Sequence, residues 1–262
     1  MHRLLLLLLL ALPFASGVGS CQPGSPPSTA RGFISEPLFQ ARALEFLEFA
    51  TETHGDSPLQ AIAHMERDLV DPGYTAPAGQ VDVGAWQNHF DRIRLYEDTR
   101  DFGGLYMLNA LYGYEGHPYL TPAFWEQIRQ SLFTFKMWYT DATPAVPDPA
   151  DPDRDWDNSF YWTENHQIIY HVIQYLMGQR YPAQCFTQAG FTPTGSCDGV
   201  DAEGRRFERT GAEHRAEAIP RIERWLDDHW EIGFAEGQSN GYYQKDVTPL
   251  LTLVEYAEDE TI

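Results

Sequence analysis

Apolar residues recur along most of this chain at the three- and four-residue spacing of an amphipathic helix, and the alternation typical of strands is almost absent. The pattern predicts helices over residues 37–53, 84–98, 101–113, 122–140, 159–180, 211–230 and 241–258. In the first of these, the expected apolar stripe is Leu38, Ala41, Leu44, Leu47 and Phe49. Such helices, joined by turn-rich loops over 114–120, 141–158 and 181–210, indicate an all-α fold of stacked α-hairpins.

Residues 1–20 have the pattern of a signal peptide and are excluded from the fold. The unbroken apolar run from Leu4 to Leu10 is part of a segment shorter than the ~20 apolar residues that span a bilayer. The segment ends in Val18-Gly19-Ser20-Cys21, which is similar to the lipobox of bacterial lipoproteins and predicts a lipid on the Cys21 thiol. Ordinary cleavage after Ala15 or Gly17, with Cys21 left free, is the alternative.

A tether and one large domain follow the signal peptide. Residues 21–35 are rich in Pro, Gly and Ser, which predicts a flexible segment that cannot bury a core. Residues 36–262 are then a single helical domain. A lipid on Cys21 would hold this domain in the cell envelope, at the periplasmic face or the cell surface, and would be its only contact with the membrane.

The chain is strongly acidic, with a formal net charge of −20. A surface of this charge repels nucleic acid and anionic lipid headgroups, so we expect neither as a partner. It also disfavours a strongly anionic polymer, unless cationic side chains gather in one cleft. Only two of the basic residues are lysines, Lys136 and Lys245.

Two cysteines remain once Cys21 is assigned to the lipid. Cys185 and Cys197 lie in a loop rich in Gly, Thr and Pro. In an exported protein this pair predicts a local disulfide. The alternative, a catalytic thiolate, needs a cationic partner, and no such residue pattern lies nearby.

The sequence predicts no metal site and no cofactor. Counted from Asp151, the EF-hand pattern requires glycine and glutamate where this chain has Trp156 and Trp162. His166 and His171 are five residues apart, unlike the four-residue spacing of a zincin pair. Phosphate-loop and dinucleotide-binding motifs are absent from the sequence. The loop with this incomplete EF-hand match is acidic and contains Asp148, Asp151, Asp153, Asp155 and Asp157.

The start of the helix expected over 159–180 carries the residues best suited to chemistry. We expect Thr163 to cap this helix by accepting a hydrogen bond from a backbone N–H, with Glu164, Asn165 and His166 in the first turn. A helix N-terminus carries partial positive charge, so an amide and an imidazole there could meet a carboxylate. The alternative is that Asn165 and His166 only tie down the loop 141–158.

Several segments resemble a bacterial group of (α/α) toroid proteins related to alginate and heparinoid lyases. The resemblance rests on Trp162–Gln167, on Tyr175–Pro182, and on the later segments Arg224–Asp227, Gly233–Glu236 and Ser239–Tyr243. It covers roughly residues 85–262 and implies an (α/α)6-type toroid. The helical pattern runs to the last residues without a capping glycine, which predicts an incomplete toroid, the N-terminal part of a larger ring.

The resemblance implies glycan processing by β-elimination on a uronate-containing polysaccharide. Asn165 would neutralise the uronate carboxylate, His166 or a tyrosinate would take the proton from C5, and Tyr243 or Tyr242 would protonate the leaving oxygen. Trp162 and Glu164 would lie in the binding region beside them.

Two other classes of function stay open. The lyases of this kind often have Asn-Asn-His where this chain has Glu164-Asn165-His166, and Glu164 with Glu236 would instead form the carboxylate pair of a glycoside hydrolase. A lipoprotein that binds glycan or a partner protein without turnover is the third possibility.

Overall fold

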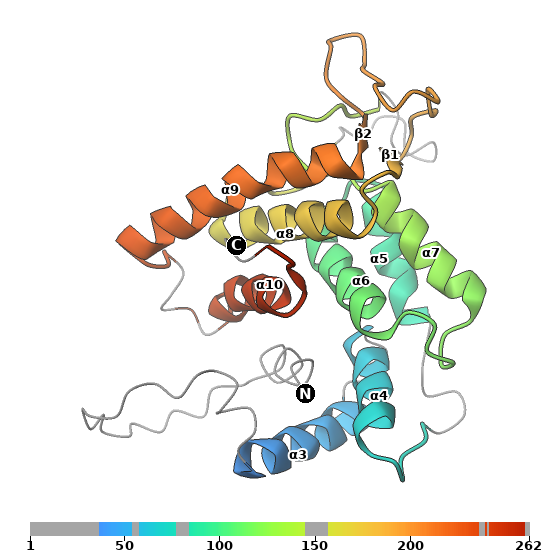
Figure 1. The fold of residues 1–262 in the computed structure, drawn as a ribbon, viewed down its shortest axis with the longest axis vertical. Helices are drawn as coiled ribbons and strands as arrows, with labels where there is room; N and C mark the ends of the chain where they lie inside the picture. Colours follow the sequence, from blue (N-terminus) through green and yellow to red (C-terminus); the bar gives the residue numbers. More distant parts are fainter. Residues whose placement is uncertain are drawn as a thin grey trace.

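The computed structural model describes residues 37–53, 58–76, 84–144, 157–235, 239 and 241–259, and this part of the chain is mostly helical (Figure 1). The all-α prediction is confirmed. The described helices are α3 (Pro37–Thr53), α4 (Pro58–Val70), α5 (Gly84–Arg94), α6 (Arg100–Tyr114), α7 (Pro122–Phe133), α8 (Glu164–Arg180), α9 (Gly211–Ile232) and α10 (Tyr243–Tyr256). None of them is long and apolar enough to cross a bilayer. The predicted signal peptide, tether and Cys21 lie outside the described residues, as does most of the acidic loop.

Helix α8 lies at the centre of the C-terminal helices. It packs against α9 on one side and α10 on the other, and α6 also contacts it (Figure 1). Its side chains are buried from Ile168 to Met177, because a helix surrounded by other helices has no polar face.

The crossing of α8 and α9 is made by two glycines. A Cβ on Gly178 would lie 2.4 Å from the carbonyl oxygen of Gly211, and a Cβ on Gly211 would lie 2.1 Å from that of Tyr181. Both distances are far below van der Waals contact. Only glycine lets the two backbones approach this closely.

Two of the predicted helices end earlier than the periodicity indicates. The helix expected over 122–140 ends at Phe133, and the backbone carbonyl of Lys136 accepts a hydrogen bond from Arg100 at 3.2 Å instead of from its own helix. The helix expected over 84–98 ends at Arg94, before Tyr96 and Thr99 adopt left-handed φ values of 55° and 63°. Such backbone cannot continue a right-handed helix.

The apolar stripe expected in 37–53 is confirmed at Leu47, which is buried, and is wrong at other positions. Leu44 and Phe49 are 45% and 50% exposed, and Ala43 and Ala50 are buried in their place. The buried residues follow helical spacing. Position 41 is exposed as well, and the side chain of Leu38 lies outside the described set.

Candidate functional site

Helices α6 and α8 begin side by side, and their first turns bring an acid and a base together. Asp101 is the second residue of α6, His166 is the third of α8, and Nδ1 of His166 lies 2.6 Å from Oδ2 of Asp101. Asp101 is fully buried and His166 is 8% exposed. The pairing joins residues that are 65 positions apart in the sequence.

The Asp101–His166 pair has the geometry of an oriented general base. Burial raises the pKa of the Asp101 carboxyl, and the hydrogen bond with His166 opposes that rise. When Nδ1 of a neutral imidazole donates to a carboxylate, the lone pair is on Nε2. The carboxylate also stabilises the imidazolium that forms when Nε2 takes a proton. A neutral His166 that donates from Nδ1 to Asp101 is therefore held in one orientation, with its lone pair on Nε2.

Aromatic rings border His166 on two sides. The ring centroid of Phe102 lies 5.1 Å from that of His166, and the centroid of Phe160 lies 6.5 Å away in a stacked arrangement. Phe160 is 55% exposed, so this side of the imidazole lies near the surface.

The cap of α8 differs from the expected one. Thr163 is at the N-cap but accepts no hydrogen bond from the backbone. Its hydroxyl donates instead to Oδ1 of Asn165 at 2.6 Å. Asn165 is 1% exposed, and its Nδ2 has no hydrogen-bond partner within the described ranges. This amide lies under the surface of the site and is not displayed on it.

Glu164 is held by the end of α9. Its Oε2 lies 3.0 Å from Nε2 of His229 and accepts a hydrogen bond from the backbone N–H of Ala235 at 2.8 Å. Its carbonyl oxygen accepts from the indole of Trp225 at 2.9 Å. The carboxylate thus joins the start of α8 to the end of α9. Its predicted partner Glu236 lies outside the described residues.

The two candidate tyrosines lie at the start of α10. Tyr242 is the N-cap residue of α10 and Tyr243 its first residue, and they are 53% and 36% exposed. The ring of Tyr243 meets Phe234 edge to face at 5.5 Å, and Phe234 in turn lies 5.3 Å from His229. This chain of rings connects Tyr243 to the group that holds Glu164.

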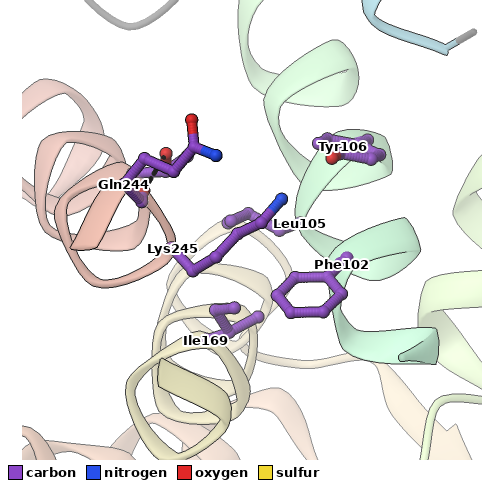
Figure 2. A pocket seen from close by; sticks show the side chains of 7 residues that line it. Phe102, Leu105, Tyr106, Ile169, Gln244 and Lys245 are labelled. Atoms are coloured by element: carbon purple, nitrogen blue, oxygen red, sulfur yellow. Dashed lines mark hydrogen bonds between the residues drawn. The ribbon is translucent and has the colours of Figure 1, made fainter. Parts of the chain in front are cut away.

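Lys245, which the sequence did not single out as a site residue, projects into a hollow next to the Asp101–His166 pair. Figure 2 shows its side chain extending from α10 toward α6, where Phe102 and Tyr106 lie. Burial lowers the pKa of Lys245, and attraction to Asp101 opposes the shift. The signal that could have identified it is its rarity, because the chain has one other lysine.

Trp162 is the most exposed of the predicted site residues described by the structure, at 62%. Its ring lies 4.4 Å from that of Tyr139, which is 43% exposed. Two adjacent exposed rings form a surface on which the apolar face of a sugar can stack.

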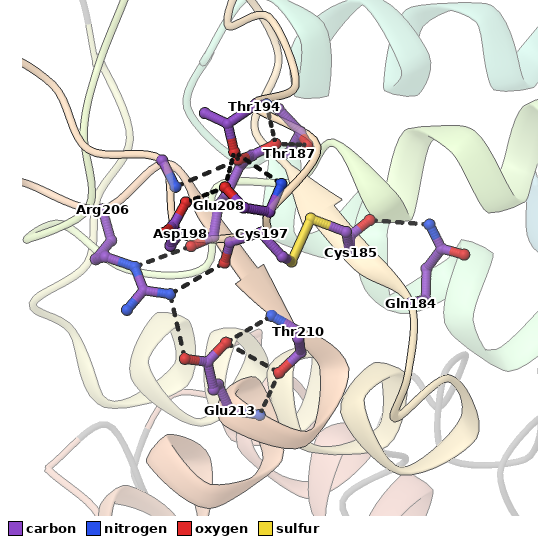
Figure 3. The surroundings of a disulfide bond; sticks show 12 residues. Gln184, Cys185, Thr187, Thr194, Cys197, Asp198, Arg206, Glu208, Thr210 and Glu213 are labelled. Carbon is purple, nitrogen blue, oxygen red and sulfur yellow. Dashed lines mark hydrogen bonds and ion pairs between the residues drawn. A yellow bond between two sulfur atoms is a disulfide. The ribbon is translucent and has the colours of Figure 1, made fainter.

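Cys185 and Cys197 form a disulfide (Figure 3). Their Cα atoms are 5.5 Å apart. The bond lies in a loop with a short antiparallel pair, β1 (Cys185–Thr187) and β2 (Glu208–Thr210), which the sequence did not predict. Its position beside β2 and the start of α9 gives it a structural role.

Among the described residues, no group of three or more His, Cys, Asp or Glu side chains is arranged so that it could hold a metal ion. His166 pairs with Asp101, and His171 packs against Trp138 with ring centroids 4.5 Å apart. Burial lowers the pKa of His171 to about 3.

Comparison of the chain with protein-family models, with curated proteins and with solved structures finds no match. The resemblance to toroid lyases gains no support from these comparisons, so the functional argument depends on the site geometry.

Proposed function

We propose that this protein processes uronate-containing polysaccharides by β-elimination. The observation that carries the proposal is the Asp101–His166 pair, an imidazole 2.6 Å from a buried carboxylate at the start of two packed helices. Proton abstraction from carbon next to a carboxylate needs such an oriented base.

The reaction follows from the residues around this pair. Nε2 of His166 takes the proton from C5 of the uronate, and Asp101 stabilises the resulting imidazolium. The electron pair left at C5 forms the C4–C5 double bond and expels the glycosidic oxygen from C4. Tyr243, on the surface of α10, donates a proton to that oxygen. The products are an unsaturated uronate and a new chain end.

Glu164 favours elimination over hydrolysis. A carboxylate pair for hydrolysis needs an acid and a base directed at the glycosidic bond. Oε2 of Glu164 contacts His229 and the N–H of Ala235, at the end of α9 and in the turn after it. Those donors also offset the charge that would otherwise repel a uronate.

A binding function without turnover is the second candidate. The exposed ring pair of Trp162 and Tyr139 favours it, because stacking on a sugar needs no catalytic group. The same pair would also serve as an outer subsite for a polymer under cleavage.

The (α/α)6-type toroid and the lipid anchor on Cys21 belong to the same proposal. Stacked helix pairs support the toroid, and the leader pattern supports the anchor and a position in the cell envelope.

Ultraviolet absorbance during incubation with a panel of uronate polysaccharides tests the reaction. We expect a rise from the unsaturated product, and its loss in His166→Ala. A reducing-end assay run in parallel detects hydrolysis, which produces new ends without the absorbance. A flat trace on every polymer, from protein shown to be folded by circular dichroism, contradicts the lyase proposal.

A further inference from the structure

The two lysines of this chain have opposite surroundings. Lys136 is 1% exposed, and its Nζ lies 2.7 Å from Oδ2 of Asp157 and 2.8 Å from Oγ1 of Thr143. Lys245 has neither a hydrogen bond nor an ion pair from its Nζ to any residue that the structure describes. Lys136 is therefore a structural cation, and Lys245 carries a charge that the described structure leaves unpaired.

Lys245 lies in a hollow between α6, α8 and α10 whose cavity volume of about 10 Å³ has room for one water-sized group, such as a carboxylate oxygen (Figure 2). The walls are largely apolar, and Nζ lies 4.9 Å from the ring centroid of Phe102. A cation over an aromatic face gains attraction from the ring, but this replaces only part of its lost hydration. An anionic group entering the hollow would supply the missing counter-charge. The lining residues are Phe102, Leu105, Tyr106, Ile169, Gln244, Lys245 and Thr248.

Tyr106 offers a second donor to the same hollow. Burial raises the pKa of its phenol, with Asp101 adding to the rise, so the hydroxyl keeps its proton. No hydrogen bond joins this hydroxyl to another described residue. The hydroxyl of Thr248 is already used, since it donates to the carbonyl of Gln244 at 2.7 Å. Lys245 and Tyr106 are thus donors in the lining that make no hydrogen bond to another described residue.

The ring of Phe102 lies next to both the hollow and the imidazole of His166. Phe102 lies 4.9 Å from Nζ of Lys245 and 5.1 Å from the centroid of His166. Nζ and the imidazole centre are therefore no farther apart than the sum of these two distances. In a uronate the carboxylate is one bond from C5, so a sugar bound here would place its carboxylate at Lys245 and its C5–H toward His166.

We propose that Lys245 and Tyr106 form the subsite that binds the carboxylate of the sugar acid whose C5 faces His166. The assignment deepens the proposed function and depends on it for the identity of the sugar. It gives to Lys245 the neutralising role that the sequence resemblance gives to Asn165, whose amide is 1% exposed. Pairing with a cation stabilises the negative charge that develops on the carboxylate as the C5 proton leaves.

Amine labelling tests this subsite without requiring turnover. The protein is treated with limiting acetic anhydride, and peptide mass spectrometry compares Lys245 with Lys136, the internal control. We expect acetylation of Lys245 to be faster, and to be slowed severalfold by uronate oligosaccharides but not by neutral oligosaccharides of the same length. Labelling of Lys245 that no uronate oligomer slows, or no labelling at Lys245, overturns the proposal.

Substitution gives the second readout. We expect Lys245→Met to weaken the binding of uronate oligosaccharides by roughly tenfold or more in calorimetry, because a charge-assisted hydrogen bond is lost. Lys245→Arg should keep a large part of the affinity. An unchanged affinity in folded Lys245→Met contradicts the assignment.

The two proposals fail in different ways. Protection of Lys245 by uronates with no ultraviolet product keeps the subsite and removes the lyase reaction. An ultraviolet product with unprotected Lys245 and an unchanged affinity in Lys245→Met keeps the reaction and removes the subsite.

Discussion

At the scale of single residues, the candidate base is a property of a pair and not of one side chain. An imidazole without a partner rotates and exchanges tautomers, whereas Asp101 holds His166 through Nδ1 at 2.6 Å. Asp101 touches no substrate in the proposed reaction. It is a positioning residue whose charge acts on the imidazolium.

Asp101→Asn tests this positioning role. The amide retains the shape but removes the charge, so we expect the rate of the ultraviolet assay to fall by about 10²-fold or more. Asp91→Asn, an exposed aspartate on α5, is the matched control and should leave the rate unchanged. Thermal melts establish that both variants fold. A rate in Asp101→Asn equal to that of the parent protein contradicts the role.

The sequence predicted one half of the pair. His166 follows a cap residue at a helix start, and that local pattern was sufficient to place it in the first turn of α8. Asp101 is 65 residues away, and nothing local distinguishes it from other aspartates at helix starts. Lys245 was missed for the same reason, because its hollow is formed by three helices. Tertiary packing determines which residues of different helices meet. Local patterns in a single sequence do not show these contacts.

At the scale of elements, the contact between α8 and α9 fixes the frame of the site. The glycines of the crossing leave no side chain between the two backbones. The same helices meet again at the opposite end, where Glu164 binds His229 and Ala235. Two separate contacts therefore set the position of the first turn of α8.

Gly178→Ala should destabilise the protein. Its new methyl group would lie 2.4 Å from a backbone carbonyl, and forcing such a group into a packed contact costs about 1–3 kcal/mol. Gly73→Ala is the control, since the nearest atom to its Cβ would be 3.5 Å away. Urea unfolding measures both. Equal stability of the two variants would contradict the prediction, because it would mean that α8 and α9 can move apart without a cost in free energy of unfolding.

The capping box at the start of α9 gives a second prediction. Oγ1 of Thr210 accepts from the N–H of Glu213 at 3.2 Å, and Oε2 of Glu213 accepts from the N–H of Thr210 at 2.8 Å (Figure 3). We expect Thr210→Ala to lower the free energy of unfolding by about 1 kcal/mol, and Thr210→Ser to preserve most of it. Similar losses in both variants would place the effect in the methyl group and not in the cap.

The sequence pattern did not predict helix α4. Its buried face includes Gln60, His64 and Glu66, so its apolar stripe is interrupted. Two of these polar groups find partners in other helices: Gln60 donates to the carbonyl of Thr51 at 3.0 Å, and Tyr114 donates to Glu66 at 2.8 Å. Periodicity in hydrophobicity identifies helices with apolar buried faces, such as α6, and misses those buried through hydrogen bonds.

At the scale of the whole molecule, folding is linked to pH through buried histidines. His214 is 3% exposed, and burial, with Arg209 adding to it, lowers its pKa to about 3. The unfolded chain binds a proton at His214 near pH 6.5, whereas the folded protein does not. The stability that neutral His214 contributes is therefore present above pH 6.5 and decreases as the pH falls toward 3.

His214→Gln isolates this contribution. Between pH 7 and pH 5 the term from His214 amounts to about 2 kcal/mol. We expect the stability of the parent protein to fall by that much more than that of the variant over this range in urea unfolding. The difference between the two proteins excludes the opposite contribution of Asp101, whose pKa is raised by burial. Parallel curves for the two proteins contradict the prediction.

The two parts of the candidate site are carried by different helices, which also pack against each other. The backbones of α8 and α9 contact each other directly, with no side chains between them. We therefore expect these two helices, with His166 on α8, to move as one rigid body. Lys245 and Tyr243 are carried by α10. Because α10 packs against α8 without a backbone-to-backbone glycine contact, we expect any opening of the site to be a shift of α10 relative to α8.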